Sequence, residues 1–306
     1  MVSVVIPTYN ASEYLPRLLL SLQQQTIPLE LIILDSESTD NTREILNLNN
    51  VPYTSISKSS FNHGATRNIG INLASHEIVM FLTQDAIPYD CHSLRLLYDS
   101  LVKTDCAGMA YGRQIPYPNT GIFGAAARLI NYSSESIVKN KAMIPTLGIT
   151  TCSSSNSFAA YKKELLLQHG GFPEHTILGE EVSVAARLIL QGYSLVYCAE
   201  AKVYHSHDYS ILQEFSRYFD IGVFHKQQQH VLCHYEKAES GGYRYVINES
   251  QYLIKQGHSL LIPVQILRVL MKYLGYKIGT KYTVLPLTVS RSLSMHKSFW
   301  TQIHEK

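Results

Sequence analysis

Residues 2–10, VSVVIPTYN, decide the fold: a short β-branched run stops at a proline, and polar residues follow it. Residues 12–25 then carry leucines at the spacing of an amphipathic helix, and residues 29–35, LELIILD, form a second apolar run. Continuous apolar runs of this length are typical of strands that are covered on both faces. The order of strand, helix and strand therefore predicts a parallel βαβ unit.

The alternation of strands and helices continues over the next fifty residues. Strands that alternate with helices indicate an α/β fold with a mostly parallel central sheet flanked by helices. The expected helices are 39–46, with Ser38 or Thr39 as its N-cap, and 64–73, and the expected strands are 53–56 and 77–82.

The character of the chain changes at residue 113. Glycine, proline, asparagine and serine are dense in residues 113–160, so we expect long loops over the edge of the sheet there. Regular elements are expected again afterwards. They are a strand at 158–161, a helix from 162, a helix at 180–190, a strand at 195–204 and a helix at 210–230.

Composition excludes several classes of protein. The chain has 306 residues with a formal net charge of +2, which is too little positive charge for a general nucleic-acid binder. The five cysteines contain no C-x-x-C pair, which argues against a zinc ribbon or a disulfide framework and favours reduced thiols in the cytosol. No basic region precedes the first apolar run and no stretch approaches 18 apolar residues, so neither a signal peptide nor a membrane-spanning helix is expected.

Polar clusters follow three of the predicted strands, and ligands of open α/β sheets bind at such strand ends. Asp35 ends the second strand, where its carboxylate can accept a hydrogen bond from a base or a ribose hydroxyl. Asp85 follows the fourth strand and is a candidate ligand of Mg²⁺ or Mn²⁺. Arg67 lies on a helix near the same edge and is a candidate phosphate ligand. No G-x-G-x-x-G follows the first strand and no P-loop motif occurs, which disfavours a dinucleotide fold and a P-loop enzyme.

Two further groups are candidates for chemistry. Glu180 and Glu181 open a predicted helix, and Glu181 shares a face with an apolar stripe, which suits a general base at the wall of a cleft. His205 and His207 form H-x-H at a strand end, where both side chains share one face and one of them could complete a metal shell.

The last part of the chain is basic and amphipathic. From residue 262 onward it contains seven lysines and arginines but only one acid, Glu305. Apolar residues recur at helical spacing between the bases over 262–297, which predicts a helix that lies on an anionic membrane surface. The alternative is a helix that packs on the domain with a solvated basic side.

Taken together, these clusters resemble the inverting nucleotide-sugar glycosyltransferases of family 2, which have the GT-A fold. SVVIPTYN, LIILDSESTDNT, FNHGATRNIG, FLTQDAIP, GGF and GEEVSVAARLILQGY carry the resemblance, in that order, over about residues 1–210. It implies a catalytic domain at 1–210, with a nucleotide-binding half at about 1–112 and an acceptor-side half at about 113–210. Residues 211–306 would form a helical, basic C-terminal extension.

The family's roles can be carried to matching positions. Asp35 would meet the pyrimidine, and Arg67 and Gln84 would lie beside the nucleotide. Asp85 matches the last acid of the family's D-x-D motif, which holds the metal and the diphosphate, although Thr83 replaces the first acid. The residues that would line the base and the ribose are Pro7, Thr8 and Tyr9.

The catalytic acids follow from the same resemblance. Glu181 matches the catalytic base and Glu180 the acid before it, while Arg187 closes the motif and would bind the nucleotide sugar. Glu181 is one methylene longer than the family's Asp, so Glu180 stays an alternative base. His205 or His207 falls where a metal-binding histidine can occur.

The finer pattern, with FNHGATRN, TQDA, YGRQIP and KVYHSH, is similar to a rhamnosyltransferase branch that builds bacterial surface polysaccharides. It implies transfer of L-rhamnose from dTDP-L-rhamnose to a lipid-linked or growing oligosaccharide, with Mg²⁺ or Mn²⁺ and without nucleic acid. A UDP-sugar donor and a non-catalytic subunit that binds nucleotide sugars or glycans are the alternatives. The expected location is the cytoplasm, with peripheral association at the inner face of the cell membrane.

Overall fold

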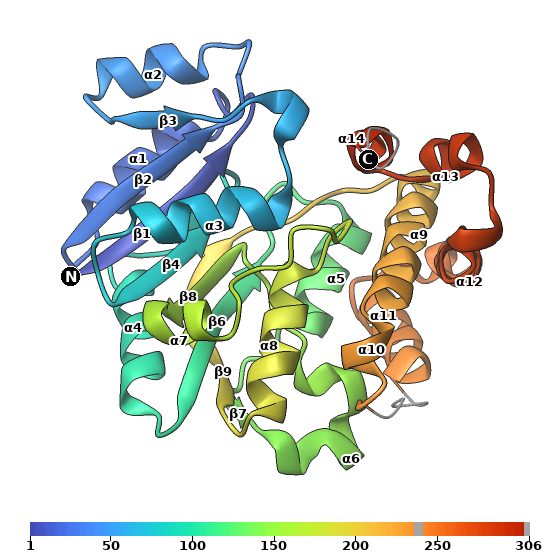
Figure 1. Ribbon diagram of the computed structural model, residues 1–306. Coiled ribbons are helices and arrows are strands. Elements are labelled where there is room, and N and C mark those ends of the chain that lie inside the picture. Colours follow the sequence, from blue (N-terminus) through green and yellow to red (C-terminus); the bar gives the residue numbers. More distant parts are fainter. Residues whose placement is uncertain (236–240, 303–306) are drawn as a thin grey trace.

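Figure 1 shows the computed structural model, which describes residues 1–235 and 241–302. Within these residues the strands are β1 (Val2–Thr8), β2 (Leu29–Asp35), β3 (Tyr53–Ser55), β4 (Ile78–Leu82), β5 (Ile87–Pro88), β6 (Ala107–Ile115), β7 (Ile137–Lys139), β8 (Phe158–Lys162) and β9 (Ser194–Tyr204). The helices that flank them are α1 (Leu15–Gln23), α2 (Thr42–Leu48), α3 (His63–Leu73), α4 (Ser93–Lys103), α5 (Ile122–Asn131), α6 (Ile144–Leu147), α7 (Lys163–Gln168) and α8 (Glu180–Leu190). The C-terminal helices are α9 (Ile211–Gln227), α10 (Gln229–Leu232), α11 (Gly241–Lys255), α12 (Ile262–Gly279), α13 (Leu287–Leu293) and α14 (Lys297–Gln302).

One mixed sheet runs through the protein in the order β3-β2-β1-β4-β8-β6-β9-β5, with β7 also paired to β9. The four strands β3, β2, β1 and β4 are parallel, as the sequence predicts. Antiparallel pairing begins at β8, which lies between β4 and β6. The predicted α/β fold, a central sheet flanked by helices with a helical C-terminal extension, is therefore confirmed.

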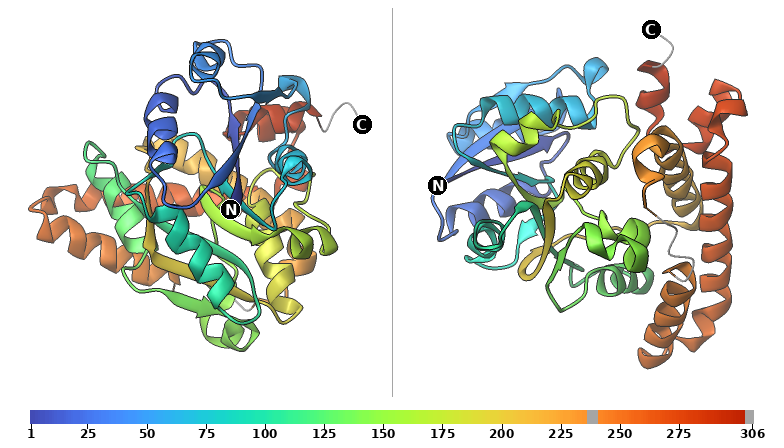
Figure 2. Two further views of the ribbon diagram at one scale, coloured as in Figure 1. Left: turned by 90° about the vertical axis from the view of Figure 1, so that its left-hand side faces the viewer. Right: turned by 60° about the horizontal axis from the view of Figure 1, so that its bottom comes forward.

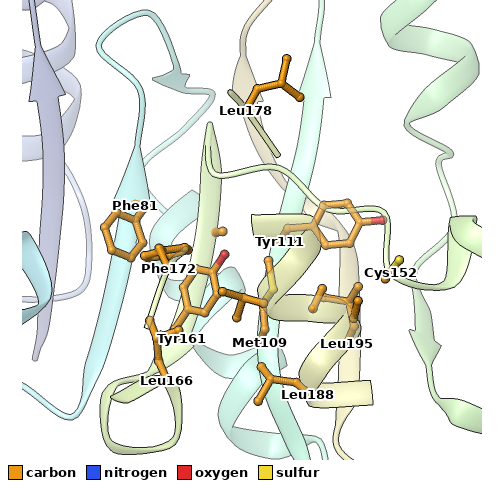
Figure 3. Packing of buried hydrophobic residues seen from close by; sticks show 14 of the residues in the cluster. Phe81, Met109, Tyr111, Cys152, Tyr161, Leu166, Phe172, Leu178, Leu188 and Leu195 are labelled. Carbon is orange, nitrogen blue, oxygen red and sulfur yellow. The ribbon is translucent and has the colours of Figure 1, made fainter. Parts of the chain in front are cut away.

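Both faces of the sheet are buried. Along β1 and β4 successive side chains alternate between two apolar clusters, so that Val5 and Phe81 belong to one and Val4 and Met80 to the other. Figure 3 shows the first cluster, in which Phe81, Tyr161 and Phe172 meet edge to face with ring centroids 5.2–5.6 Å apart. This burial explains why the strands read as continuous apolar runs.

Two local predictions were wrong. The N-cap of α2 is Asn41 rather than Ser38 or Thr39, because the Ser38 hydroxyl bonds Asp35 instead. Residues 113–160 are not mainly loops, since they contain the end of β6 and the helix α5. The alanines of α5 are strong helix formers, and they outweigh the turn-forming residues on either side.

The C-terminal helices α9–α14 lie along one side of the sheet domain (Figures 1 and 2). Helices α9 and α12 approach very closely, because glycines stand where they cross. A Cβ atom on Gly275 or Gly279 would collide with the carbonyl oxygen of Phe215 or Phe219. Glu305 and Lys306, which count with the basic tail, lie outside the described residues. Within residues 1–235 and 241–302, none of the helices combines the length and apolar character needed to cross a membrane.

Candidate active site

Three potential metal ligands meet where β4 and β9 end. The Nε2 atoms of His205 and His207 lie 3.4 and 3.6 Å from Oδ2 of Asp85. One ligand atom from each of the three residues lies within 4.8 Å of the others. The H-x-H pattern therefore does bring both imidazoles to one place, beside the predicted acid. Their role as ligands stays a prediction.

A buried amide fixes the orientation of His205. Its Nδ1 lies 2.8 Å from Oε1 of Gln114, and the same oxygen accepts a hydrogen bond of 2.6 Å from Arg128. Because Oε1 is an acceptor, Nδ1 carries the proton and the Nε2 lone pair faces Asp85. Two electron-rich atoms at 3.4 Å repel each other unless a cation lies between them, and metal-bound histidines are typically oriented in this way. The group therefore fits a divalent cation.

The charges of the cluster suit a cation too. Burial by itself would raise the pKa of Asp85, but its interactions with His205 and His207 hold that pKa well below its usual range. Burial and the neighbouring His205 lower the pKa of His207 to about 4. At neutral pH the site thus offers a carboxylate and an uncharged His207 imidazole, the forms that bind metals.

Glu180 is buried in an ion pair. It begins α8 after Gly179, whose positive φ of 73° lets the chain turn into the helix. Its Oε1 lies 2.7 Å from Nη1 of Arg67, and Nδ2 of Asn156 donates to the same oxygen at 3.3 Å. Burial would raise the pKa of Glu180, but Arg67 and His63 lower it. Glu180 is therefore ionised, and Arg67 is a buried partner rather than a solvated helix residue.

Glu181 has a different environment from Glu180. It is half-buried, and among the residues described no other side chain donates a hydrogen bond to its carboxylate. Burial and the adjacent negative charge of Glu180 raise its pKa to about 8. A carboxyl group with a pKa near neutrality and no partner is suited to take up a proton during a reaction. Of the two acids, this geometry favours Glu181 as a base.

Asp35 lies at the end of β2 with no exposed surface. Its Oδ1 accepts from the hydroxyls of Thr8 and Ser38, and its Oδ2 accepts from the Ser38 amide and from Nε of Arg43, 2.6 Å away. These four bonds occupy the four lone-pair positions of a carboxylate. A base could bind Asp35 only if one of these partners moved. Arg43 is the partner that can do so, because its side chain is 36% exposed. The predicted contact between Asp35 and a pyrimidine stays a prediction.

The first strand ends beside the fourth. The side-chain amide of Gln84 accepts a hydrogen bond from the Tyr9 backbone N–H at 2.8 Å and donates one to the Tyr9 carbonyl at 3.1 Å. Lys58 lies over the Tyr9 ring, 4.6 Å from its centroid. Pro7 is half-buried and Thr8 is buried, so Tyr9 is the exposed member of this predicted set. The polar residues that follow β1 and β4 therefore lie together at the carboxyl ends of the strands, as the sequence predicts.

The sequence predicts a site role for Arg187 but none for Arg217. Arg187 donates to the carbonyl of Gly171 and so holds the loop that leads into α8, while its predicted role beside the nucleotide is untested. Arg217, on α9, was missed, although its charge acts on both Glu181 and His207. Gln114 occurs in the YGRQIP pattern, but the sequence predicts no role for it in the site. Neither Arg217 nor Gln114 carries a local signal, because its position depends on how distant segments pack.

The strand-end site, the acidic helix start and the mixed sheet define a glycosyltransferase of the GT-A class. The chain belongs to the family described as Glycosyl transferase family 2, whose model matches residues 3–170. It is 43% identical over 309 residues to the O-antigen chain rhamnosyltransferase RfbN of Salmonella typhimurium, covering 99% of this chain and 96% of that protein. It is 42% identical to the O-antigen chain rhamnosyltransferase WbaN of Salmonella anatum, covering 98% of this chain and 96% of that protein.

Solved structures share the fold. The mannosyltransferase PcManGT from Pyrobaculum calidifontis, in complex with GDP-Man and Mn²⁺, superposes with a TM-score of 0.57 at 16% identity, covering 100% of this chain and 86% of that one. Residues 1–349 of S. aureus TarS, in complex with UDP-GlcNAc, give a TM-score of 0.53 at 17% identity, covering 92% of this chain and 91% of that one. At these identities the likeness shows the fold alone.

Proposed function

We propose that this protein is an inverting rhamnosyltransferase that transfers L-rhamnose from dTDP-L-rhamnose to a growing surface polysaccharide. The observation that carries the proposal is the 43% identity to an O-antigen chain rhamnosyltransferase over 99% of the chain. Identity of this extent includes the C-terminal helices as well as the part that the family has in common.

Glu181 is the general base of the proposed reaction. The acceptor hydroxyl attacks the anomeric carbon of the donor while Glu181 takes up its proton, and the nucleoside diphosphate leaves from the opposite face. One C–O bond forms and one breaks, and the configuration of the sugar inverts because the attack comes from the face opposite the leaving group. Glu180 remains ionised beside Arg67, and its charge keeps the pKa of Glu181 high enough for a base that works near neutrality.

Asp85, His205 and His207 are the proposed ligands of a divalent cation. When bound, the cation supplies positive charge that offsets the charge developing on the diphosphate leaving group. Between Mg²⁺ and Mn²⁺ we favour Mn²⁺, because two of the three ligands are imidazole nitrogens and Mg²⁺ prefers oxygen. Tyr9, Asp35, Arg67, Gln84 and the residues around them are the proposed contacts of the nucleotide.

We further propose that α12 rests on a membrane surface, which would suit a lipid-linked acceptor. Its outward side exposes apolar side chains, of which Leu270 and Tyr273 are 53% and 57% exposed, with the exposed Lys277 one turn further on. Arg268 and Lys272 do not contribute to this surface, since they turn inward and pair with Glu214. An exposed apolar stripe edged by lysine is typical of a helix that lies in a lipid interface.

A donor screen tests the proposed reaction. Purified protein with Mn²⁺ is mixed with dTDP-L-rhamnose, UDP-glucose, UDP-galactose, UDP-N-acetylglucosamine or GDP-mannose, and thermal shift and release of nucleoside diphosphate are followed. We expect stabilisation and slow release with dTDP-L-rhamnose alone. Glu164→Gln, a change of an exposed acid on α7, is the matched control for Glu181→Gln.

The other outcomes are equally informative. Selective response to a UDP-sugar would keep the enzyme class and reject rhamnose as the sugar. Binding of a donor without release, in a protein that circular dichroism shows to be folded, would favour a non-catalytic subunit.

A further inference from the structure

A cavity of about 570 Å³ opens between the sheet domain and the C-terminal helices. It is lined by α5, by the segment after β9 and by α9, α11 and α12. Much of its lining therefore comes from residues beyond 170, where the match to the family model ends. The cavity thus combines α5, which lies inside the family match, with segments that lie beyond it.

The cavity carries an excess of positive charge. Arg268 and Lys272 share one carboxylate oxygen of Glu214, at 3.1 and 3.3 Å, so these three groups leave one positive charge over. Asp208 lies at the start of α5, where its Oδ2 accepts a hydrogen bond from the Gly121 amide at 2.9 Å. Even with the charge of Asp208 counted, the four arginines and lysines of the lining outnumber its two acids.

Arg128 and Arg217 are the other cations of the lining. Arg128 donates to Gln114. Arg217 is half-buried and, within residues 1–235 and 241–302, has neither a hydrogen-bond acceptor nor an acidic partner. A guanidinium that is partly removed from water and unpaired is available to an anionic ligand, and its planar donors match phosphate.

The cavity adjoins the reaction site. His207 belongs both to its lining and to the proposed metal group. The charge of Arg217 also acts on the proposed base Glu181. A ligand in the cavity therefore lies beside the proposed metal group and within electrostatic reach of the proposed base.

We infer that this cavity binds the acceptor through a diphosphate at its reducing end, with Arg217 as the main phosphate ligand. This inference rests on the proposed function, because it assigns the second substrate of that reaction. The excess of cations favours a phosphate-bearing acceptor over a neutral sugar. The aromatic rings of the cavity point the same way, since Arg268 lies over Phe123 at 4.3 Å and Lys272 over Tyr245 at 5.3 Å, which leaves less ring surface for a sugar to stack on.

The test is a binding measurement that requires no turnover. Geranyl diphosphate is titrated into the full-length protein by calorimetry, in EDTA and excess dTDP, so that neither a metal nor the nucleotide site accounts for binding. Octyl glucoside is the neutral probe. Arg217→Gln removes the charge, Arg217→Lys keeps it, and Arg244→Gln is the matched control, an exposed arginine on α11.

We expect geranyl diphosphate to bind at least about 10-fold more tightly than octyl glucoside. Arg217→Gln should weaken its binding about 10-fold or more, which corresponds to about 1.4 kcal/mol. Arg217→Lys should fall between that variant and the original protein, and Arg244→Gln should stay within about twofold. Melting temperatures check that each variant is folded.

Three results would overturn the inference: equal binding of the diphosphate by the original protein and Arg217→Gln, equal or tighter binding of octyl glucoside, or no binding of the diphosphate while excess dTDP is present. The donor screen requires no acceptor, so failure of the proposed function would appear there instead. The two conclusions can therefore fail separately.

Discussion

The two adjacent glutamates at the start of α8 permit a test that separates their roles. Glu180 is held by Arg67 at 2.7 Å, while Glu181 has a pKa of about 8, raised by burial and by the charge of Glu180. With that pKa only about one tenth of Glu181 is ionised at pH 7, so activity should rise with pH up to about 8.

Glu180→Gln removes the neighbouring negative charge and leaves Arg67 without its carboxylate partner. Both effects favour the ionised form of Glu181, so its pKa should fall by about 1–3 units. The rising limb of the pH profile should therefore move to lower pH, and activity at pH 7 relative to the plateau should increase. Glu181→Gln should instead lower the plateau by about 10²–10⁴-fold and remove the limb.

The assay is the release of nucleoside diphosphate from the donor that the screen selects, measured from about pH 5.5 to 9.5 for both variants, a range that brackets the pKa on either side. Glu164→Gln controls for the loss of one exposed negative charge. If Glu180→Gln lost the plateau while Glu181→Gln kept it with an altered limb, Glu180 would be the base. If neither variant changed the profile, the reasoning from burial and charge would be refuted.

Contacts elsewhere in the protein permit three more tests. Asp85→Asn should weaken Mn²⁺ binding, measured by calorimetry, at least about 10-fold. Turnover by the original protein should be faster with Mn²⁺ than with Mg²⁺. Equal affinity of the variant and the original protein for Mn²⁺ would remove Asp85 from the metal site. Asp220, fully buried on α9, has a pKa that burial raises from 3.8 to about 6, so it destabilises the fold increasingly as pH rises from about 4 to 6. The free energy of unfolding of Asp220→Asn, measured in urea titrations, should therefore rise relative to that of the original protein by up to about 3 kcal/mol between pH 4 and pH 7. A difference between the two proteins that stayed the same at both pH values would contradict this. Gly279→Ala should cost about 1–3 kcal/mol by the same measurement, because its Cβ would meet the backbone of α9, whereas Gly242→Ala, with nothing within 4 Å, should not destabilise.

The first half of the fold was predictable because its signals are local. Each of β1, β2 and β4 is an apolar run, and parallel pairing follows from the helices between them. The placement of polar groups at the strand ends required only the rule that such ends meet at one edge. For the same reason Asp85, His205 and His207 could be proposed together from the sequence alone.

The surroundings of those residues were not predictable, because they depend on pairing between distant segments. Gln114 bonds His205 only because β6 and β9 are neighbours, with Gln114 opposite Val203 in register. Similarly, the sequence showed that α12 is amphipathic but not which side faces inward. The buried Glu214 decides this, since an acid removed from water requires cations.

Helix α12 is therefore inverted relative to an ordinary surface helix, and this has a geometric consequence. Arg268, Lys272, Gly275 and Gly279 recur on its inner side, whereas the exposed leucines lie on its outer side. If the outer side rests on lipid as proposed, the cations of the cavity lie about one helix diameter, roughly 10 Å, from that surface. A diphosphate attached directly to a lipid chain is an acceptor group that would remain within that distance of a bilayer. A long glycan without a lipid would gain nothing from this arrangement. Because the two groups of side chains lie on opposite sides of α12, membrane binding and diphosphate binding should be lost separately in variants of the outer and inner sides.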